Sequence, residues 1–127
     1  LERMQYIKKD GGNRFGFAHI EHLQLECFKG RDTSFKDTFG RLYWDKPSST
    51  ITTKFYAVSN GRFTHPEENR AISLGEGAAL QSFPQDYKFF GKSIASIARL
   101  IGNAVPPEYA KRIGQAIINN HYSNNQQ

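Results

Sequence analysis

Cysteine is nearly absent from this sequence: Cys27 is the single one among 127 residues. One cysteine can form no disulfide within the chain and no cysteine cluster for zinc, so we expect a reducing, intracellular setting. Cys27 follows Glu26 and precedes Phe28, with no neighbouring proline or base. This context favours a small buried side chain over a nucleophile.

Long hydrophobic runs are missing too. The apolar stretches are far short of the roughly 20 residues that cross a bilayer, and the N-terminal segment has no signal-peptide core. Aromatic residues make up 13% and charged residues 23% of the chain, which excludes disorder for most of it. We expect one soluble domain. The chain begins with Leu1, which we interpret as a sign that it is a piece of something longer.

Self-contained catalytic and metal-binding motifs are also missing. The four histidines lack metal-ligand spacing, and the nearest case, His19-x-x-His22, is more typical of a loop or surface pair. The glycines from Gly11 to Gly16 follow no predicted strand and lead to no Gly-Lys-Ser/Thr, so they are weak grounds for a phosphate-binding loop. The chain is therefore unconvincing as a freestanding enzyme.

Positive charge is in excess and unevenly distributed. The 17 lysines and arginines outnumber 12 acidic residues, giving a formal net charge of +5. Residues 1–65 hold 11 basic and 7 acidic residues, whereas residues 66–127 hold 6 and 5. A basic first half favours a nucleic-acid partner, although an ordinary solvated surface explains the same charge.

Two styles of sequence meet near His65. Before it, apolar residues at roughly every second position of residues 50–58 predict a strand, and residues 59–62 predict a turn. After it, the pattern is helical. We therefore expect an α+β fold, with a small region of strands and loops over 1–65, a helical segment over 66–122 and a flexible tail over 123–127.

A capping box predicts the first of three short helices. Ser73 is followed three positions later by Glu76, which predicts a helix over about 74–82 that ends at Phe83-Pro84. Such a helix needs no partner to define where it begins.

Two further helices are predicted downstream. Ser93 can cap one, which Gly102 ends, and Pro107 opens the other. Their apolar residues recur at helical spacing and mark buried faces: Ile94, Ile97, Ala98 and Ile101 in one, and Tyr109, Ile113, Ala116 and Ile117 in the other.

Three phrases follow one another in a fixed order: GRLYWDKPSSTITT over 40–53, RAISLGEGAALQSFP over 70–84, and IGNAVPP over 101–107. Together they resemble the C-terminal part of bacterial DNA (cytosine-5-)-methyltransferases, in which the end of the target-recognition domain precedes the ninth and tenth sequence motifs. The resemblance covers roughly residues 37–118. It implies part of an enzyme that transfers a methyl group from S-adenosylmethionine to carbon 5 of cytosine in DNA.

The first phrase carries candidate DNA contacts. Arg41 offers a rigid donor fork suited to guanine or phosphate, and Thr50, Thr52, Thr53 and Lys54 combine short hydroxyls with a cation beside backbone N–H groups. The resemblance implies a recognition loop at Arg41, a backbone-phosphate contact at Thr50, and a second recognition loop from Lys54 to Gly61. The residues alone also allow a threonine-rich solvent face with an arginine that packs on an aromatic neighbour.

The second phrase is expected to be structural. Arg70 can reach acidic groups or tie two regions together, Glu76 caps the helix and Phe83 anchors it. The resemblance likewise implies a motif that organises the recognition domain without performing chemistry. Gly75 and Gly77 depart from the family pattern and are expected to weaken the helix by roughly 1 kcal/mol each.

The third phrase carries ligand chemistry. Gly102 permits a sharp bend, and Asn103 can donate and accept hydrogen bonds. The resemblance implies that Asn103 and Ala104 approach the amino-acid end of S-adenosylmethionine, and that the helix over 107–120 packs against a catalytic sheet. On physical grounds alone the phrase is a junction between two helices.

The catalytic motifs of that family do not occur in this sequence, which has no Pro-Cys nucleophile, Glu-Asn-Val segment or Phe-x-Gly-x-Gly loop. We expect a fragment that is inactive alone and binds the cofactor weakly or not at all. Its expected partners in the bacterial cytoplasm are duplex DNA, the missing catalytic region and, through the last helix, a second copy. Two alternatives stay open: a stand-alone DNA-binding or interaction module that lost catalysis, and a structural remnant.

Overall fold

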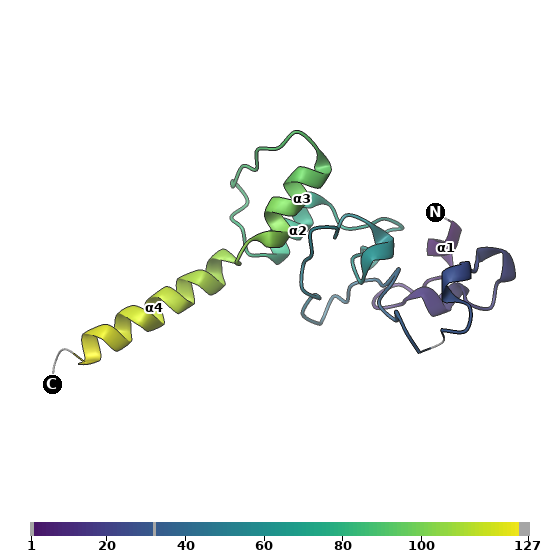
Figure 1. Cartoon of the computed structure of the whole chain (residues 1–127), viewed down its shortest axis with the longest axis horizontal. Helices are drawn as coiled ribbons and strands as arrows, with labels where there is room; N and C mark the ends of the chain where they lie inside the picture. The colour runs from purple at the N-terminus through teal and green to yellow at the C-terminus, as the bar shows by residue number, and fades with distance from the viewer. Residues whose placement is uncertain (1, 32, 125–127) are drawn as a thin grey trace.

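The computed structural model describes residues 2–31 and 33–124, with side chains described up to residue 121. Short helical turns occupy the first half of the chain and longer helices the second (Figure 1). The elements are α1 (Glu2–Gln5), η1 (Arg14–Phe17), η2 (Glu21–Leu23), η3 (Glu26–Phe28), η4 (Val58–Asn60), α2 (Leu74–Leu80), α3 (Ile94–Asn103) and α4 (Pro107–Asn124), where η marks a 3-10 turn.

The described residues form no β-strand, so the expected α+β fold with its strand-rich first half is wrong. Backbone pairing there consists of two isolated bridges, a parallel one between Arg41 and Thr64 and an antiparallel one between Thr64 and Ala71. The first half is instead a set of turns and irregular loops.

Residues 50–58 show why the strand prediction fails. The chain turns within them, since the Phe55 N–H donates to the Thr52 carbonyl at 3.3 Å. Ile51 and Phe55 are both buried, so the apolar residues meet the core through a turn. A strand needs a partner ladder, and β-branched residues do not fix an extended conformation without one.

Arginine side chains satisfy loop carbonyls in place of a sheet. Arg14 is 4% exposed, and its guanidinium donates to the carbonyls of Arg31, Ser34 (2.8 Å) and Phe35 (3.3 Å). Arg62 donates to three further loop carbonyls. A guanidinium offers five donors in a rigid plane, so one side chain can hold several turns together.

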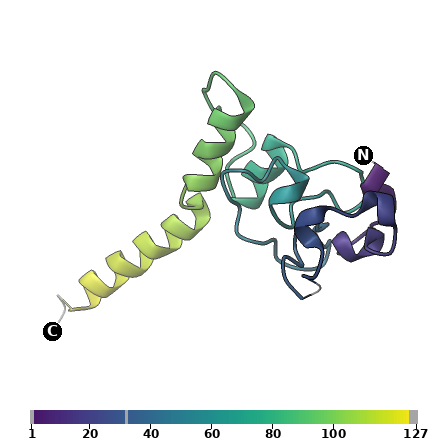
Figure 2. The same ribbon diagram turned by 45° about the vertical axis from the view of Figure 1, so that its right-hand side comes forward.

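Two hydrophobic clusters form the interior, and α2 and α3 lie side by side over the second (Figures 1 and 2). The first cluster lies under the turns of the first half and contains Met4, Ile7, Phe17, Leu23 and Phe39. The second contains Leu42, Ile51, Phe55, Phe63, Ile72, Ala78, Ala98 and Ile101.

The starts of the helices agree with their sequence signals. The Ser73 hydroxyl accepts the Glu76 N–H at 3.1 Å and the Glu76 carboxylate accepts the Ser73 N–H at 2.6 Å, so the capping box is confirmed. Ser93 caps α3 with a serine three positions later as its partner. This helix continues through Gly102 and ends at Asn103, one residue beyond the expected stop.

Helix α4 projects from the body of the molecule (Figures 1 and 2). It has 18 residues and is longer than the short helix predicted. Tyr109, Ile113 and Ile117, which belong to the predicted buried face, are 60%, 44% and 63% exposed. The Glu108 N–H donates to the Ser82 hydroxyl at 3.2 Å and joins the start of α4 to the body. The apolar face of α4 is therefore uncovered in this chain.

The environments of cysteine and histidine complete the fold. Cys27 is exposed, so the expectation of a buried thiol is wrong: in the η3 turn it is Phe28 that packs against the first cluster. His22 pairs with Glu2 at the surface, with 3.2 Å between Nε2 and Oε1.

Across residues 2–31 and 33–124, no three histidine, cysteine or acidic residues gather into a metal site, and no helix is long and apolar enough to span a membrane.

Candidate nucleic-acid interface

Residues 50–54, here called the threonine turn, lead into a tight turn that the Phe55 N–H and the Thr52 carbonyl close, and they present polar side chains to solvent. Ile51 within it (4% exposed) and Phe55 directly after it (0%) are buried. The Thr52 hydroxyl accepts the Lys54 N–H at 3.4 Å, which closes the turn locally. These two buried anchors therefore hold its hydroxyls and cation in place. Thr50, Thr52 and Lys54 are exposed, and Thr53 is half-buried.

Two helix glycines allow α2 and α3 to approach the threonine turn closely. A Cβ on Gly102 would lie 2.5 Å from the Thr52 carbonyl carbon and 2.6 Å from the Thr53 nitrogen. A Cβ on Gly77 would overlap the Phe55 ring. A larger residue at either position would displace the turn or its anchor, so these glycines serve packing, beyond the bend and the helix weakening predicted for them.

The end of α3 is fixed from another direction by Gln81, the residue that follows α2. Gln81 is 8% exposed, and its Nε2 donates to the Ile101 carbonyl at 3.0 Å. The Ala104 N–H donates to the same carbonyl at 3.2 Å. Asn103 is exposed and Ala104 half-buried. The structure thus brings the candidate cofactor residues next to the threonine turn, one residue beyond the contact at Gly102.

Arg41 is buried and so is not part of this exposed surface. Its side chain is 1% exposed, and its five N–H donors meet five acceptors. An enclosed guanidinium with every donor engaged presents no free fork to DNA, so Arg41 organises loops here and the structure gives no support to its predicted DNA contact. Burial lowers the pKa of the guanidinium below its ordinary value. The acceptors are the carbonyls of Met4, Ile7, His65 and Glu68 and the Asn69 side chain.

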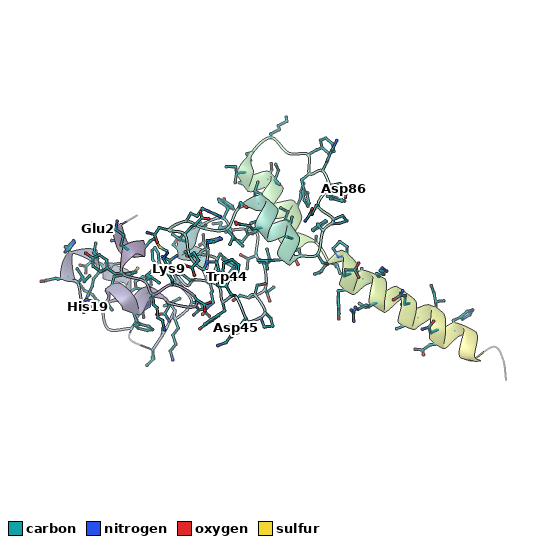
Figure 3. All side chains as sticks on the ribbon, turned by 180° about the vertical axis from the view of Figure 1, so that it is seen from behind. Glu2, Lys9, His19, Trp44, Asp45 and Asp86 are labelled. Carbon is teal, nitrogen blue, oxygen red and sulfur yellow. The ribbon has the colours of Figure 1, made fainter. Side chains whose placement is uncertain are left out.

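The cations that lie over the Tyr43 ring are Lys46 and Arg62, whereas the alternative drawn from the sequence places Arg41 on an aromatic neighbour. The Lys46 ammonium lies 4.2 Å and the Arg62 guanidinium 5.1 Å from the centre of the Tyr43 ring. Trp44 is 65% exposed and meets the His65 ring edge-on at 5.8 Å. Figure 3 shows Trp44 on the same body of loops as Lys9 and Asp45, away from α4.

Arg70 and Glu76 form the expected structural link before α2. The Arg70 guanidinium also binds the Glu68 carboxylate, with 2.7 Å from Nε to Oε2. The hydrogen bonds from Arg70 and the bond from the Ser73 backbone hold the pKa of Glu76 at about 2, well below its usual range. The Glu68 pKa is lowered by the same arginine. Both carboxylates are therefore ionised at neutral pH and serve structure.

Phe83 anchors the loop between α2 and α3, as its position in the second phrase predicts. Its ring lies 5.0 Å from Tyr87 and 4.9 Å from Phe89, centre to centre. Pro84 is exposed, and its carbonyl accepts the Tyr87 N–H at 3.1 Å. Figure 3 shows Asp86 on this loop, with Glu2 and His19 at the far end of the molecule. The loop, the end of α3 and the residues that join α3 to α4 line a groove that includes Phe90, Leu100, Ala104 and Val105.

Comparison with known proteins assigns the chain to a family. A family model described as C-5 cytosine-specific DNA methylase matches residues 3–119. The chain belongs to this methylase family. The type II methylase M.HgiDII of Herpetosiphon aurantiacus is 44% identical over 101 residues, which are 76% of this chain and 28% of that protein.

Two further bacterial relatives of this methylase chain agree. The type II methyltransferase M1.BsuMI of Bacillus subtilis (strain 168) is 38% identical over 104 residues, 82% of this chain and 23% of the relative. The type II methyltransferase M.BbvI of Brevibacillus brevis is 39% identical over 118 residues, 93% of this chain and 30% of the relative. The chain spans less than a third of the length of these relatives.

Gln81 is the residue of this methylase chain that sequence reasoning missed. It stands three positions after Ala78 and four after Gly77, both buried, so helical spacing extends the buried face to it. A polar side chain in such a place signals a buried hydrogen bond. Its partner, the Ile101 carbonyl, is 20 residues away and could not be named from the pattern.

Proposed function

We propose that this chain is the DNA-recognition and C-terminal part of a DNA (cytosine-5-)-methyltransferase, with the threonine turn on the DNA backbone. Family membership supports DNA as the partner, and the observation that carries the proposal is the threonine turn, whose exposed polar side chains are held in place by the buried Ile51 and Phe55. Hydroxyls, backbone N–H groups and a lysine ammonium are the groups that bind phosphate oxygens.

The residues after the threonine turn are proposed to read bases. Phosphate contacts set the register of a protein on the duplex, and sequence is read by side chains held beside them. Ser59 and Asn60 are exposed, and both lie in the η4 turn that follows. An asparagine amide can form paired hydrogen bonds with adenine in the major groove, so Asn60 is the candidate with the sharpest base preference.

Asn103 and Ala104 are proposed to form one edge of the S-adenosylmethionine site. Asn103 lies exposed at the C-terminal end of α3, where its amide can donate to a carboxylate and the helix end favours a cation. The amino-acid end of the cofactor carries both groups, so these residues fit it. The bound cofactor supplies the methyl group, while this chain binds and orients it from one side.

The catalytic region that completes the enzyme is proposed to cover α4. Tyr109, Ile113 and Ile117 recur every four residues and form one uncovered apolar face. The matched segments are under a third of the relatives, whose remaining length provides such a region. We expect the completed enzyme to act in the bacterial cytoplasm.

Duplex binding by the chain tests the DNA assignment. We expect affinity to fall steeply with salt, and Lys54→Ala to lower the slope of log affinity against log salt by about one. Lys111→Ala, on the projecting α4, is the matched control and should leave the slope unchanged. Fluorescence anisotropy with a labelled duplex measures both. Binding that is undetectable at low salt, or independent of salt, would contradict the assignment.

Methyl transfer tests the second half of the proposal. The chain alone should transfer no labelled methyl group to DNA, because the sequence contains neither the Pro-Cys nucleophile nor the main cofactor loop. Activity should be restored when the catalytic region of a relative is added. Methyl transfer by the chain alone would contradict the proposal that the catalytic groups lie in a separate region of the enzyme. Duplex binding without restored activity would favour a recognition module that lost catalysis.

A further inference from the structure

The last turn of α3 lies against the back of the threonine turn. The atoms that a Cβ on Gly102 would overlap belong to the peptide between Thr52 and Thr53, at 2.5 to 2.6 Å. Because these are backbone atoms, no side-chain rotation can make room. Backbone of α3 and backbone of the threonine turn are therefore in direct contact, with nothing compressible between them.

Gly102 cannot retreat from this contact. The buried Gln81 amide holds the Ile101 carbonyl at 3.0 Å, and the Ile101 side chain is 0% exposed within the second cluster. The threonine turn is equally fixed, since Phe55 is 0% exposed and packs over Gly77. A displacement on one side of the contact must therefore reach the other.

We propose that Gly102 is a positioning residue that couples the threonine turn to Asn103. The inference rests on the proposed function, in which the turn binds DNA and Asn103 approaches the cofactor. When a phosphate displaces the Thr52–Thr53 peptide, the end of α3 shifts with it, and Asn103 is the next residue. By linkage the coupling is reciprocal, so a change at the end of α3 alters duplex affinity.

A first experiment needs no ligand and decides the coupling itself. Backbone amide resonances of the ¹⁵N-labelled chain are compared with those of Gly102→Ala and of Gly114→Ala. Within the described residues, a Cβ on Gly114 meets nothing within 4 Å beyond its own helix. We expect the Gly102 variant to shift the amides of Thr53 and Lys54, and the Gly114 variant to leave them in place. Unmoved threonine-turn amides in a folded Gly102 variant would overturn the proposal.

A second experiment adds a short duplex to the wild-type chain. We expect the amides of Gly102 and Asn103 to shift with those of Thr52 and Thr53, at the same duplex concentration, while Gly114 stays fixed. Shifts confined to the threonine turn would overturn the coupling and leave DNA binding intact. No shift anywhere would contradict the proposed function, while the ligand-free comparison still decides the coupling.

Affinity separates positioning from simple loss of stability. Gly102→Ala should weaken duplex binding by about tenfold and reduce its salt slope, because a displaced turn moves the Lys54 ammonium away from its phosphate and fewer counterions are released. Ile97→Val destabilises the same helix from the core side and should change neither quantity. Equal losses in the two variants would overturn the proposal. If Gly102→Ala does not fold, Gln81→Met keeps the size of that side chain, frees the end of α3, and should give the same shifts and a smaller loss of affinity.

Discussion

The Arg70 guanidinium binds both oxygens of the Glu76 carboxylate, at 2.7 Å from Nη1 and 2.8 Å from Nη2. The same carboxylate accepts the Ser73 N–H and closes the cap of α2. One side chain therefore begins a helix and also ties that helix to the loop before it. Because Gly77 of this helix holds the Phe55 anchor, the link also positions the threonine turn.

Stability should depend on pH through Glu76. Its folded-state pKa is about 2, below the value of an unfolded glutamate, so its contribution is complete above about pH 5 and is lost as pH falls towards 2. Glu76→Gln should cost about 1 kcal/mol at pH 7. A glutamine oxygen can still accept the Ser73 N–H, so the loss comes from the ion pair with Arg70, which is screened because the carboxylate is 36% exposed. Urea unfolding at a series of pH values measures the effect.

Glu108→Gln is the matched control for this pH dependence. Glu108 faces Lys111 at 3.8 Å, and both side chains are more than 60% exposed. The control should unfold like the wild type across the range. A Glu76→Gln variant that keeps the full acid dependence of the wild type would show that other carboxylates cause it.

Two glycines in α2 should respond oppositely to alanine. A Cβ on Gly75 would find the Ser73 hydroxyl at 4.0 Å as its nearest neighbour, so Gly75→Ala should stabilise the chain by about 0.5 to 1 kcal/mol. A Cβ on Gly77 would overlap the Phe55 ring, so Gly77→Ala should destabilise it by about 1 to 3 kcal/mol. Thermal and urea unfolding check the signs, and equal effects of the two substitutions would refute the packing role of Gly77.

The helices could be predicted because their signals are local. Ser73 and Glu76 stand three positions apart, and the chemistry that joins them needs no other part of the chain. The loops could not be predicted in this way. Arg41 contacts carbonyls 24 to 37 residues away, and no local pattern encodes such a set. The alternation in residues 50–58 was genuine, but a strand requires a partner that the described chain does not supply.

The sequence predicts which residues the candidate site contains, but it does not predict which distant parts of the chain are in contact there. Thr50, Thr52 and Lys54 are exposed together, as a DNA-facing segment requires. Their contact with Gly102 joins residues some 50 positions apart, and a bend was the natural local explanation for that glycine. The role of Gln81 could not be predicted, because an amide at a helix end is usually solvated. Here it is buried and donates to the Ile101 carbonyl, next to Gly102.

Arg41 substitutions should lower the free energy of unfolding and leave duplex binding by the folded protein unchanged. Arg41→Met removes five donors and leaves buried carbonyls without partners, which should cost more than about 3 kcal/mol. Arg41→Lys keeps the charge but has fewer donors and no planar fork, and should cost about 2 kcal/mol. Urea unfolding measures both losses.

Arg112→Met, on the exposed surface of α4, serves as the control for Arg41 and should change stability by less than about 0.5 kcal/mol. At temperatures where Arg41→Lys remains folded, its duplex affinity should match the wild type. A folded Arg41→Lys protein that loses discrimination between duplex sequences would show that Arg41 takes part in DNA recognition.

The uncovered face of α4 should cause the isolated chain to self-associate. Ile113 and Ile117 are 44% and 63% exposed on the same face, and an apolar stripe of this kind is stabilised by covering it. Ile113→Ser with Ile117→Ser should shift the chain towards monomer, as measured by sedimentation at increasing concentration. Ile118→Ser removes a comparable area, 54% exposed, from another side of the helix and should have little effect.

Adding the catalytic region of a relative should compete with self-association, because both would cover the same face. A wild-type chain that stays monomeric at high concentration would show that this face tolerates water, and packing against a catalytic region would then need support from other contacts.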